Sequence, residues 1–524
     1  MDNANPHESA TRRNFRERLP LLFGAAFLCV IFLLLIQAAI HKELNHDENM
    51  YLSGGVLLYQ GLLPYKDFPY FQMPLSTLVY AITLWTSGDL LLGARLVNTT
   101  FTFLTCLALY FGVLRICANV SQPVRVALAS SGVILFVSNP TLLYTAGLAW
   151  NHDLPVFLAV SGLVLLVWSF AHVRITFILL MSGMLFGLAV SARLSFAVAV
   201  VPIALAVLTV EPTSGTDSIM GRVRRCFTYC LGVLVGLLPS LFFLLADPAA
   251  FWFGNMEYHQ LNGQFWEQSG YTRAMTFSGK IAYLSDVVSA EPFNWLLLAG
   301  TLLIFVLVWR AGLHRTGLLA VYLSAVTAAV LLLAALVPSP TWLQYFYAPS
   351  VFVVFTFVYG VAYLCETRWR RVGYAVLPIV AAISALSILP RYLDLAGSLD
   401  LDETAPAQVH RTALEIRSAI GGRGTVATLA PIYALEAGLD IYPELAPGPF
   451  ASRVAGLLTQ ERREDFGVWS GDDLGTALSQ RPPEAVLVGL EGALEDPLVQ
   501  FATNQGYESL TLSNGLVLWV KGVK

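Results

Sequence analysis

Two adjacent carboxylates, Asp47 and Glu48, follow His46 a few positions after a long apolar run. A carboxylate can take a proton from a nucleophile, and carboxylates together with imidazoles can also bind a metal ion. A further acid, Asp153, follows His152 at the start of another apolar run. An ionised carboxylate at the edge of hydrocarbon is costly unless it is paired or serves a function. The sequence therefore presents Asp47, Glu48 and Asp153 as candidate catalytic residues.

Each of these acids also has a structural interpretation. Asp47 could be the N-cap of a helix over residues 48–60. Asp153 could cap a helix whose first turn contains a proline. Glu48 would point about 100° away from Asp47 on a helix and could make a structural hydrogen bond or a metal contact. Glu48, Asp153 and His259 are the candidate metal ligands, although no fixed ligand spacing requires a metal ion.

Basic residues near the same apolar boundaries could bind an anion. Arg193 lies between two apolar segments with no other charged residue nearby. A guanidinium can hold a phosphate through two parallel hydrogen bonds, although it can also extend to lipid headgroups. Lys66 is a second candidate for binding phosphate, whereas Arg95 is expected to anchor a span.

The composition of the 524 residues indicates a protein that lies mostly in lipid. The chain is 56% hydrophobic and 13% charged, and its mean hydropathy is +0.64. Soluble domains carry about 25% charged residues. The net charge of −4 argues against a nucleic-acid partner, which would need a basic surface.

Eleven segments are apolar and long enough to be candidate transmembrane helices, which need about 20 residues each. The expected spans are Leu19–Ile40, Leu91–Leu114, Val124–Tyr144, Leu154–Phe170, Ile175–Ser191, Leu194–Val210, Phe227–Ala246, Phe293–Val308, Leu318–Val337, Tyr345–Leu364 and Val372–Leu389. The N-terminal basic stretch leads into a span of full length without a small-residue cleavage site, so we expect an uncleaved first helix.

The positions of Lys and Arg predict the orientation of these spans. Basic residues recur in every second loop, which places the N-terminus in the cytoplasm. We expect a cytoplasmic tail at 1–18, a transmembrane module at 19–390 and an extracytoplasmic domain at 391–524. Outer loops at 41–90 and 247–292 would then share one side with that domain. The absence of a cleavable signal peptide and of a disulfide framework fits a bacterial inner membrane, with an archaeal or organellar membrane as the alternative.

The tail after residue 390 alternates short apolar runs with polar, helix-like stretches, which predicts a small α/β domain. Thr425–Ala430 and Ala485–Gly489 read as strands, and Ser509–Lys521 reads as a hairpin because Asn-Gly favours a tight turn. The glycine-rich stretch Gly421–Gly424 lacks the spacing of a phosphate loop and is expected to be a turn before a strand.

The first outer loop is only about half polar. Its apolar residues repeat at helical spacing after Asp47, and residues 74–85 are apolar but too short to span a membrane. Helices of this kind lie in the membrane interface. The acids would therefore lie at the level of the lipid headgroups, where a lipid-linked substrate presents its polar end.

This loop resembles the first outer loop of GT-C glycosyltransferases, such as protein O-mannosyltransferases and lipid A aminoarabinose transferases. The shared pattern comprises Asp47-Glu48, Tyr51, the turn Gly61–Asp67, Pro74-Leu75 and the step Gly93–Arg95. Further similarities are Asp153 at the fourth span, Arg193 where the family usually has Lys, and Gln344–Phe355 at a late span. The resemblance covers most of residues 19–390. It implies a polytopic helical fold of about 11 spans with juxtamembrane helices.

The same resemblance implies transfer of a sugar from a polyprenyl-phosphate donor to a glycan, lipid or protein acceptor at the outer face. Asp47 would be the general base, and a single displacement with one base would invert the anomeric centre. Asp153 would position the acceptor or bind a metal ion. The donor phosphate would contact Arg193, Lys66, Tyr258, His259 and Tyr345, whereas the acceptor or loop contacts would involve His46, His152, Tyr65 and Trp266.

Several alternatives remain open at this stage. The aromatic loop 247–292, which contains Tyr258 and Trp266, is either an interfacial belt or a lid over the site. Some relatives bind a divalent ion, but no cofactor is required by the sequence. A lipid-glycan flippase is the competing function, although the acids cluster at the ends of spans and no inverted repeat is evident. A polymerase or ligase with a diphosphate-linked donor is disfavoured by the acids of the first loop.

Overall fold

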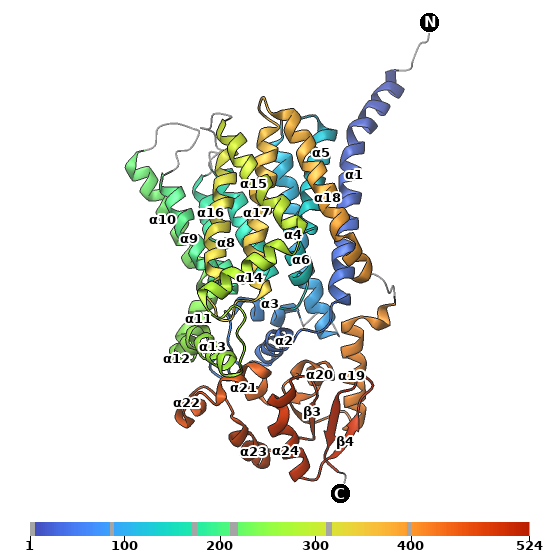
Figure 1. Cartoon of the computed structure of the whole chain (residues 1–524), viewed down its shortest axis with the longest axis vertical. Coiled ribbons are helices and arrows are strands. Elements are labelled where there is room, and N and C mark those ends of the chain that lie inside the picture. The colour runs from blue at the N-terminus through green and yellow to red at the C-terminus, as the bar shows by residue number, and fades with distance from the viewer. Residues whose placement is uncertain are drawn as a thin grey trace.

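The computed structural model describes residues 6–83, 89–169, 175–209, 218–310, 317–395 and 400–522. The other residues include 1–5 of the expected tail, 84–88 of the first outer loop and 396–399 near the start of the expected C-terminal domain, so predictions there lie outside the described residues. The described chain forms a bundle of long helices with a small domain at one end (Figure 1). The expected fold class, a polytopic helical membrane protein with a C-terminal α/β domain, is confirmed.

Six helices of the described chain are long and apolar enough to cross a membrane. They are α1 (Pro6–His41), α4 (Leu90–Ile116), α15 (Pro292–Arg310), α16 (Gly317–Ala335), α17 (Tyr347–Leu364, preceded by η4, Leu343–Phe346) and α18 (Arg370–Leu395). A seventh candidate is the pair α10 (Ile219–Gly236) and α11 (Leu238–Ala246), bent by 51°.

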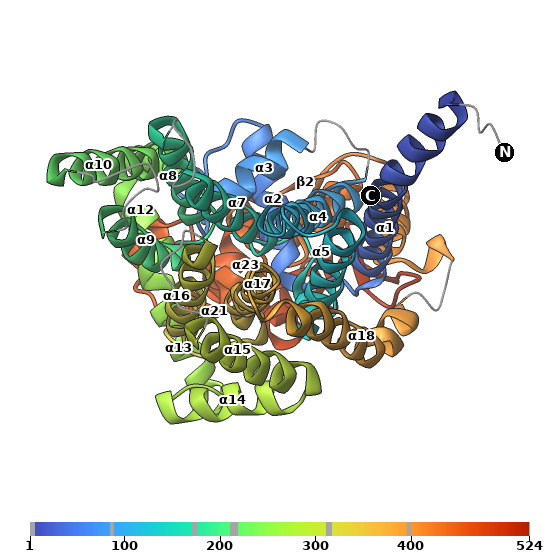
Figure 2. The ribbon, with the colours of Figure 1, turned by 90° about the horizontal axis from the view of Figure 1, so that it is seen from above.

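Four shorter apolar helices lie at the remaining expected spans, and the prediction that they also cross the membrane stays a prediction. They are α5 (Gln122–Val137), α7 (Asp153–Ser169), α8 (Ile175–Ala192) and α9 (Ala197–Thr209), which follows the short η2 (Leu194–Phe196). The expected span at 124–144 is interrupted, because Asn139 caps a separate helix α6 (Pro140–Thr145). In the view along the bundle, α17 lies in the middle (Figure 2), and 78% of its most apolar stretch is buried.

Small residues allow α8 and α10 to approach each other closely. Each helix carries two glycines four positions apart, Gly183 and Gly187 on α8 and Gly232 and Gly236 on α10. A Cβ atom at Gly187 would lie 2.2 Å from the carbonyl oxygen of Val233. Such spacing lets helix backbones pack in contact. This packing sets the position of the C-terminal end of α8, immediately before Arg193.

Short helices occupy the end of the bundle that faces the C-terminal domain (Figure 1). They are α2 (His46–Tyr59), α3 (Leu75–Thr83), α12 (Pro248–Trp252), the π-helical η3 (Phe253–Glu257), α13 (Tyr258–Gln268) and α14 (Phe277–Ser289). The expected outer loops therefore share one end of the bundle with the domain. Which face of the membrane this end occupies stays a prediction.

The C-terminal domain contains a five-stranded sheet of order β2-β1-β3-β5-β4. The strands are β1 (Thr425–Thr428), β2 (Asp440–Ile441), β3 (Ala485–Val488), β4 (Glu508–Thr511) and β5 (Val517–Val520). Strand β1 is parallel to β2 and β3, whereas β5 is antiparallel to β3 and β4. The expected strands and the hairpin are confirmed, and positive φ angles at three of the residues Gly421–Gly424 confirm a turn.

Helices surround this sheet. They are η5 (Leu401–Glu403), α19 (Ala405–Ala419), α20 (Pro431–Glu436), η6 (Pro443–Leu445), α21 (Pro449–Ala455), α22 (Gln460–Asp465), α23 (Gly471–Gln480), η7 (Gly492–Glu495) and α24 (Asp496–Asn504). The domain docks on α2, because Ser53 donates to the carbonyl of Ala446 at 2.6 Å and Asn49 accepts from the backbone N–H of Ile432 at 3.2 Å. Helix α2 is thus covered by the domain, and its expected place in the membrane interface stays a prediction.

Candidate active site

Asp47 lies in the first turn of α2 and is not the cap of this helix. The cap is Asn45, whose side chain accepts from the N–H of Asp47 at 2.9 Å. The structural alternative for Asp47 is therefore wrong. Its carboxylate is 23% exposed and lies 3.3 Å from Nε2 of His46. Asp47 keeps acceptor capacity that neither a cap nor a buried ion pair has consumed.

Glu48, the neighbouring carboxylate, is fully buried and fully engaged. Its Oε1 accepts from Nε of Arg95 at 2.9 Å and from the N–H of Ala149 at 2.7 Å. Its Oε2 accepts from Nη2 of Arg95 at 2.7 Å and from the N–H of Asn45 at 2.9 Å. A carboxylate has about four acceptor positions. This geometry argues against the catalytic and metal-binding roles predicted for Glu48 and supports the structural hydrogen-bond role.

Arg95, the partner of Glu48, is also completely buried. Besides Glu48, its guanidinium donates to the backbone carbonyls of Ala39, Lys42 and Glu43 at 2.7–2.9 Å. These carbonyls belong to the end of α1 and the residues that follow it, where helix carbonyls have no intrahelical partner. Arg95 therefore fixes α1, α2 and α4 relative to one another, as expected for an anchor.

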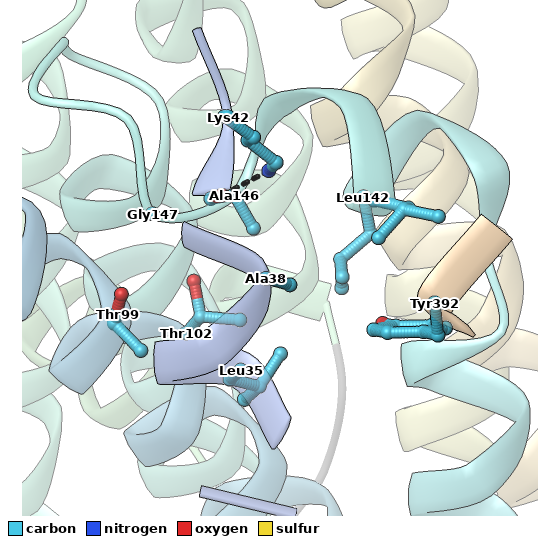
Figure 3. Close-up of a pocket in the computed structure, with 10 residues that line it drawn as sticks. Leu35, Ala38, Lys42, Thr99, Thr102, Leu142, Ala146, Gly147 and Tyr392 are labelled. Atoms are coloured by element: carbon cyan, nitrogen blue, oxygen red, sulfur yellow. Dashed lines mark hydrogen bonds between the residues drawn. The ribbon is translucent and has the colours of Figure 1, made fainter. Parts of the chain in front are cut away.

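Asp153 begins α7 and is likewise buried, with both oxygens engaged. It accepts from the N–H of Gly147 at 2.7 Å and from the hydroxyl of Tyr347 at 3.0 Å. Figure 3 shows the small pocket beside this loop, where Lys42 donates to the carbonyl of Ala146. These contacts favour a positioning role for Asp153 over direct contact with a substrate or metal ion.

Arg193 lies between α8 and η2 and is held by neutral groups. Its Nη1 donates to Oδ1 of Asn151 at 2.9 Å and lies 3.1–3.2 Å from the ring nitrogens of His152. Its guanidinium also lies 5.3 Å from the ring centre of Tyr345. No carboxylate of the described residues forms an ion pair with Arg193. The positive charge is therefore available to an anionic ligand.

The predicted base and the predicted phosphate ligand share one region. Asp47, Tyr51 and Tyr345 all interact electrostatically with Arg193. His259 also interacts with Arg193, and its ring lies 5.4 Å from that of Tyr258. The structure thus brings together residues from α2, α13, η4 and the end of α8.

Three side chains of α13 carry buried polar atoms with no hydrogen-bond partner, namely the hydroxyl of Tyr258, the amide oxygen of Asn262 and the indole nitrogen of Trp266. Tyr258 is 2% exposed, and its ring stacks on that of Phe71 at 4.1 Å, yet its hydroxyl has no partner. The indole N–H of Trp266 is also buried without a partner. A buried polar group without a partner destabilises the protein unless a ligand or water satisfies it. These atoms are therefore candidate ligand contacts.

Lys66 and Tyr65 do not join this group. The hydroxyl of Tyr65 donates to the carbonyl of Gln72, and its ring packs against Phe251 at 5.0 Å. Tyr65 has a positive φ of 71° in the turn, and Lys66 beside it is exposed. The predicted acceptor contact of Tyr65 and the predicted phosphate contact of Lys66 therefore have no support from the contacts of the described residues.

His46 faces both its neighbour Asp47 and the C-terminal domain. Its ring lies 5.8 Å from that of Phe450 on α21. Burial lowers the pKa of His46, but the hydrogen bond and charge of Asp47 outweigh it and hold the pKa above its ordinary value. Protonated His46 therefore pairs with the carboxylate of Asp47 and competes with any other group that would donate a hydrogen bond to it.

The predicted metal ligands do not come together. Within the described residues, Glu48, Asp153 and His259 form no cluster of potential ligand atoms. Such a cluster occurs elsewhere, where ligand atoms of Asp89, His410 and Glu436 lie within 4.8 Å of one another. It joins the start of α4 to the C-terminal domain, and Glu436 accepts from the N–H of Leu90 at 2.7 Å.

Sequence reasoning missed Arg453, which α21 of the C-terminal domain brings close to this region. Its guanidinium lies 4.8 Å from the ring centre of Phe450 and 5.3 Å from that of Trp266. The one available signal was a single basic residue within an apolar stretch, which does not reveal a partner more than 180 residues away in the chain.

Comparison with known proteins adds evidence on the fold. No protein-family model and no curated protein matches the sequence. The crystal structure of ArnT from Cupriavidus metallidurans in the apo state aligns with a TM-score of 0.61 and 12% identity, over 94% of this chain and 97% of that chain. The structure of the same protein bound to undecaprenyl phosphate aligns with a TM-score of 0.60 and 14% identity, with the same coverage.

At 12–14% identity, these structural alignments show a shared fold. The alignment includes nearly all of both chains, so it extends over the membrane bundle and the C-terminal domain together. The expected fold is therefore confirmed: the chain is an integral membrane protein that shares its fold with the ArnT structures.

Proposed function

We propose that this protein is an inverting glycosyltransferase, which moves a sugar from a polyprenyl-phosphate donor to an acceptor hydroxyl at the outer face of a membrane. We propose a bacterial inner membrane as its location. The observation that carries the proposal is the placement of Asp47 with free acceptor capacity near Arg193, which has no carboxylate partner among the described residues. A base and an unpaired cation in one site are what this transfer needs. The ArnT structure with bound undecaprenyl phosphate, which shares this fold, supports a polyprenyl-phosphate ligand.

The proposed reaction is a single displacement. The acceptor oxygen forms a bond to the anomeric carbon while the bond from that carbon to the phosphate oxygen breaks. Asp47 takes the proton of the acceptor hydroxyl, and the departing polyprenyl phosphate gains one negative charge. Arg193 stabilises this charge, which grows as the bond breaks, and so favours the transition state over the bound donor.

Asn151 and His152 have a supporting role in this scheme. Both contact the guanidinium of Arg193 without neutralising its charge. Tyr345 offers its ring to the same guanidinium. A fixed orientation matters because a guanidinium binds phosphate through a planar fork. These residues would therefore hold the fork in place before the donor binds.

An apolar cavity provides space for a lipid chain beside this site. The cavity has a volume of about 300 Å³, and side chains of α14, α15, α16 and α17 line it. It reaches Phe346 and Ser350, which are close in sequence to Tyr345. We propose that the polyprenyl chain occupies this cavity while its phosphate lies at Arg193.

Binding and turnover of variants test the proposal. Undecaprenyl phosphate is titrated into the protein in nanodiscs. Its dissociation constant should be at least about tenfold higher for Arg193→Ala than for the wild type, because a charged hydrogen bond is lost. Arg481→Ala, an exposed arginine of the C-terminal domain, is the control and should bind normally. Equal binding by wild type and Arg193→Ala would refute the phosphate site.

Turnover then requires a panel of labelled polyprenyl-phosphate sugars and candidate glycan, lipid and protein acceptors. The product should have the anomeric configuration opposite to that of the donor, as measured by NMR. The flippase alternative predicts passage of a labelled lipid-linked glycan across liposome membranes without chemical conversion. Flux of that kind in the absence of any transfer product would replace the enzymatic proposal.

A further inference from the structure

Arginines that lie against two aromatic rings recur in the C-terminal domain, and their ionic partners differ. Arg462 lies over Phe253 and Phe466, and Arg481 lies over Tyr442 and Trp469. Both are partly exposed, and each has a carboxylate partner, Glu257 and Glu444 respectively.

Arg453 has the same aromatic setting and no such partner. It lies over Phe450 and Trp266 and is only 8% exposed. Among the described residues it forms no hydrogen bond and no ion pair. Cation–π contacts return only part of the free energy lost when a guanidinium leaves water. The most buried of these three cations is therefore the one that lacks an anion.

Two further donors without partners lie beside Arg453. The indole of Trp266 lies under the guanidinium, and its buried N–H has no partner. The hydroxyl of Tyr258, a residue that is 2% exposed, also has none and interacts electrostatically with Arg453. One cation and two neutral donors, none with a partner among the described residues, are the kinds of group that bind an anion.

The surroundings connect this site to the proposed base. Charges that face Arg453 come from His46 and from Glu491 on the loop before η7. Glu491 is too far from Arg453 to form an ion pair. The ring of Phe450 contacts both Arg453 and His46, and His46 contacts Asp47. The rings of Phe450 and His46 thus lie between Arg453 and Asp47.

We propose that Arg453, Tyr258 and Trp266 form an anion-binding subsite for an acidic group, a phosphate or a carboxylate, of the acceptor. This assignment rests on the proposed function, in which Arg193 at the end of the bundle holds the donor phosphate. The donor phosphate is tethered to a lipid chain, whereas Arg453 belongs to the domain beyond the bundle (Figure 1). An acidic group at Arg453 would place a neighbouring acceptor hydroxyl near Asp47.

Anion titration of the full-length protein in nanodiscs tests the subsite. Inorganic phosphate is added at constant ionic strength, with chloride as the exchanged salt, and the midpoint of thermal unfolding is recorded. The wild type should show a saturable rise, and Arg453→Gln should weaken the apparent affinity about tenfold or more. Arg481→Gln is the matched control, because it has the same aromatic setting with a carboxylate partner. An unchanged titration in Arg453→Gln would refute the subsite.

Milder variants keep the test valid if Arg453→Gln fails to fold. Tyr258→Phe and Trp266→Phe keep an aromatic ring and remove one donor each, so each should weaken phosphate binding by a few-fold while Arg453 remains in place. A purely structural role of these residues predicts no change in the phosphate titration. If both variants bound phosphate with the affinity of the wild type, that result would refute the subsite without any data from Arg453→Gln.

A second arm distinguishes the source of the acidic group. Undecaprenyl phosphate should bind Arg453→Gln as it binds the wild type, whereas Arg193→Ala should bind it weakly. If Arg453→Gln lost undecaprenyl phosphate binding, the anion would belong to the donor and the acceptor assignment would be overturned. Failure of the proposed function would appear differently, as a wild type that does not bind undecaprenyl phosphate but still responds to inorganic phosphate.

Discussion

Adjacent residues Asp47 and Glu48 should respond in opposite ways to the same chemical change. Asp47→Asn and Glu48→Gln each replace a carboxylate with an amide of nearly the same shape. Asp47 has one ion pair among the described residues, with the partly exposed His46. Exposed pairs contribute about 0–1 kcal/mol to stability, so Asp47→Asn should leave the free energy of unfolding almost unchanged.

Glu48→Gln should destabilise the protein strongly. The carboxylate accepts four hydrogen bonds, two of them from Arg95. An amide oxygen can accept two bonds, whereas the amide NH₂ would face two donors. Two lost bonds to a charged group amount to about 3–6 kcal/mol, in line with about 3–5 kcal/mol for removal of one partner of a buried pair.

Two measurements separate these effects. Chemical or thermal unfolding of both variants in the same detergent reports stability, and transfer from a polyprenyl-phosphate sugar reports turnover. Asp47→Asn should lose about 10²–10⁴-fold in turnover, the contribution of a general base, while it binds undecaprenyl phosphate normally. Near-normal turnover in Asp47→Asn would refute the base assignment. Equal stability of Glu48→Gln and Asp47→Asn would refute the structural reading of Glu48.

Three further predictions follow from the site and its supports. Burial lowers the pKa of His46, but its neighbour Asp47 raises that pKa above the ordinary value of about 6.5. Turnover should therefore rise with pH, because His46 loses its proton and no longer pairs with the proposed base. His46→Gln should remove this rise from the pH profile. Gly187→Leu should push α8 away from α10, displace Arg193 and weaken undecaprenyl phosphate binding, because even a Cβ would lie 2.2 Å from a carbonyl oxygen. Leu302→Trp should fill the apolar cavity and weaken binding of the same lipid, whereas Leu303→Trp, the next residue of α15 and not part of the cavity lining, should bind it normally in the same titration.

The spans and the domain sheet could be predicted from the sequence because their physical causes are local. A membrane helix needs a continuous apolar run, and a strand needs a short apolar run bounded by turn residues. The cap of α2 was also readable, since Asn45 followed three positions later by Glu48 is a capping-box pattern. This pattern favours Asn45 over Asp47 as the cap of the helix.

The partners of the buried charges could not be predicted in this way. Glu48 meets Arg95 from a different helix, and Arg95 is otherwise satisfied by backbone carbonyls, which any sequence supplies. Arg453 reaches the site because the C-terminal domain docks on the bundle, through contacts that include Ser53, Asn49 and Leu90. Such contacts depend on how elements pack, which local patterns do not specify.

A single loop between α6 and α7 connects the two proposed reactive groups. Its N–H at Ala149 binds Glu48, beside the base, and its N–H at Gly147 binds Asp153. Two residues after Ala149, Asn151 accepts a hydrogen bond from Arg193. The two buried carboxylates therefore fix the loop at two points, Gly147 and Ala149, and the loop fixes the cation relative to the proposed base. In the proposed mechanism, Glu48 and Asp153 thus act as positioning residues: they set the separation between the proposed proton acceptor and the proposed phosphate ligand, which must be correct before the donor arrives.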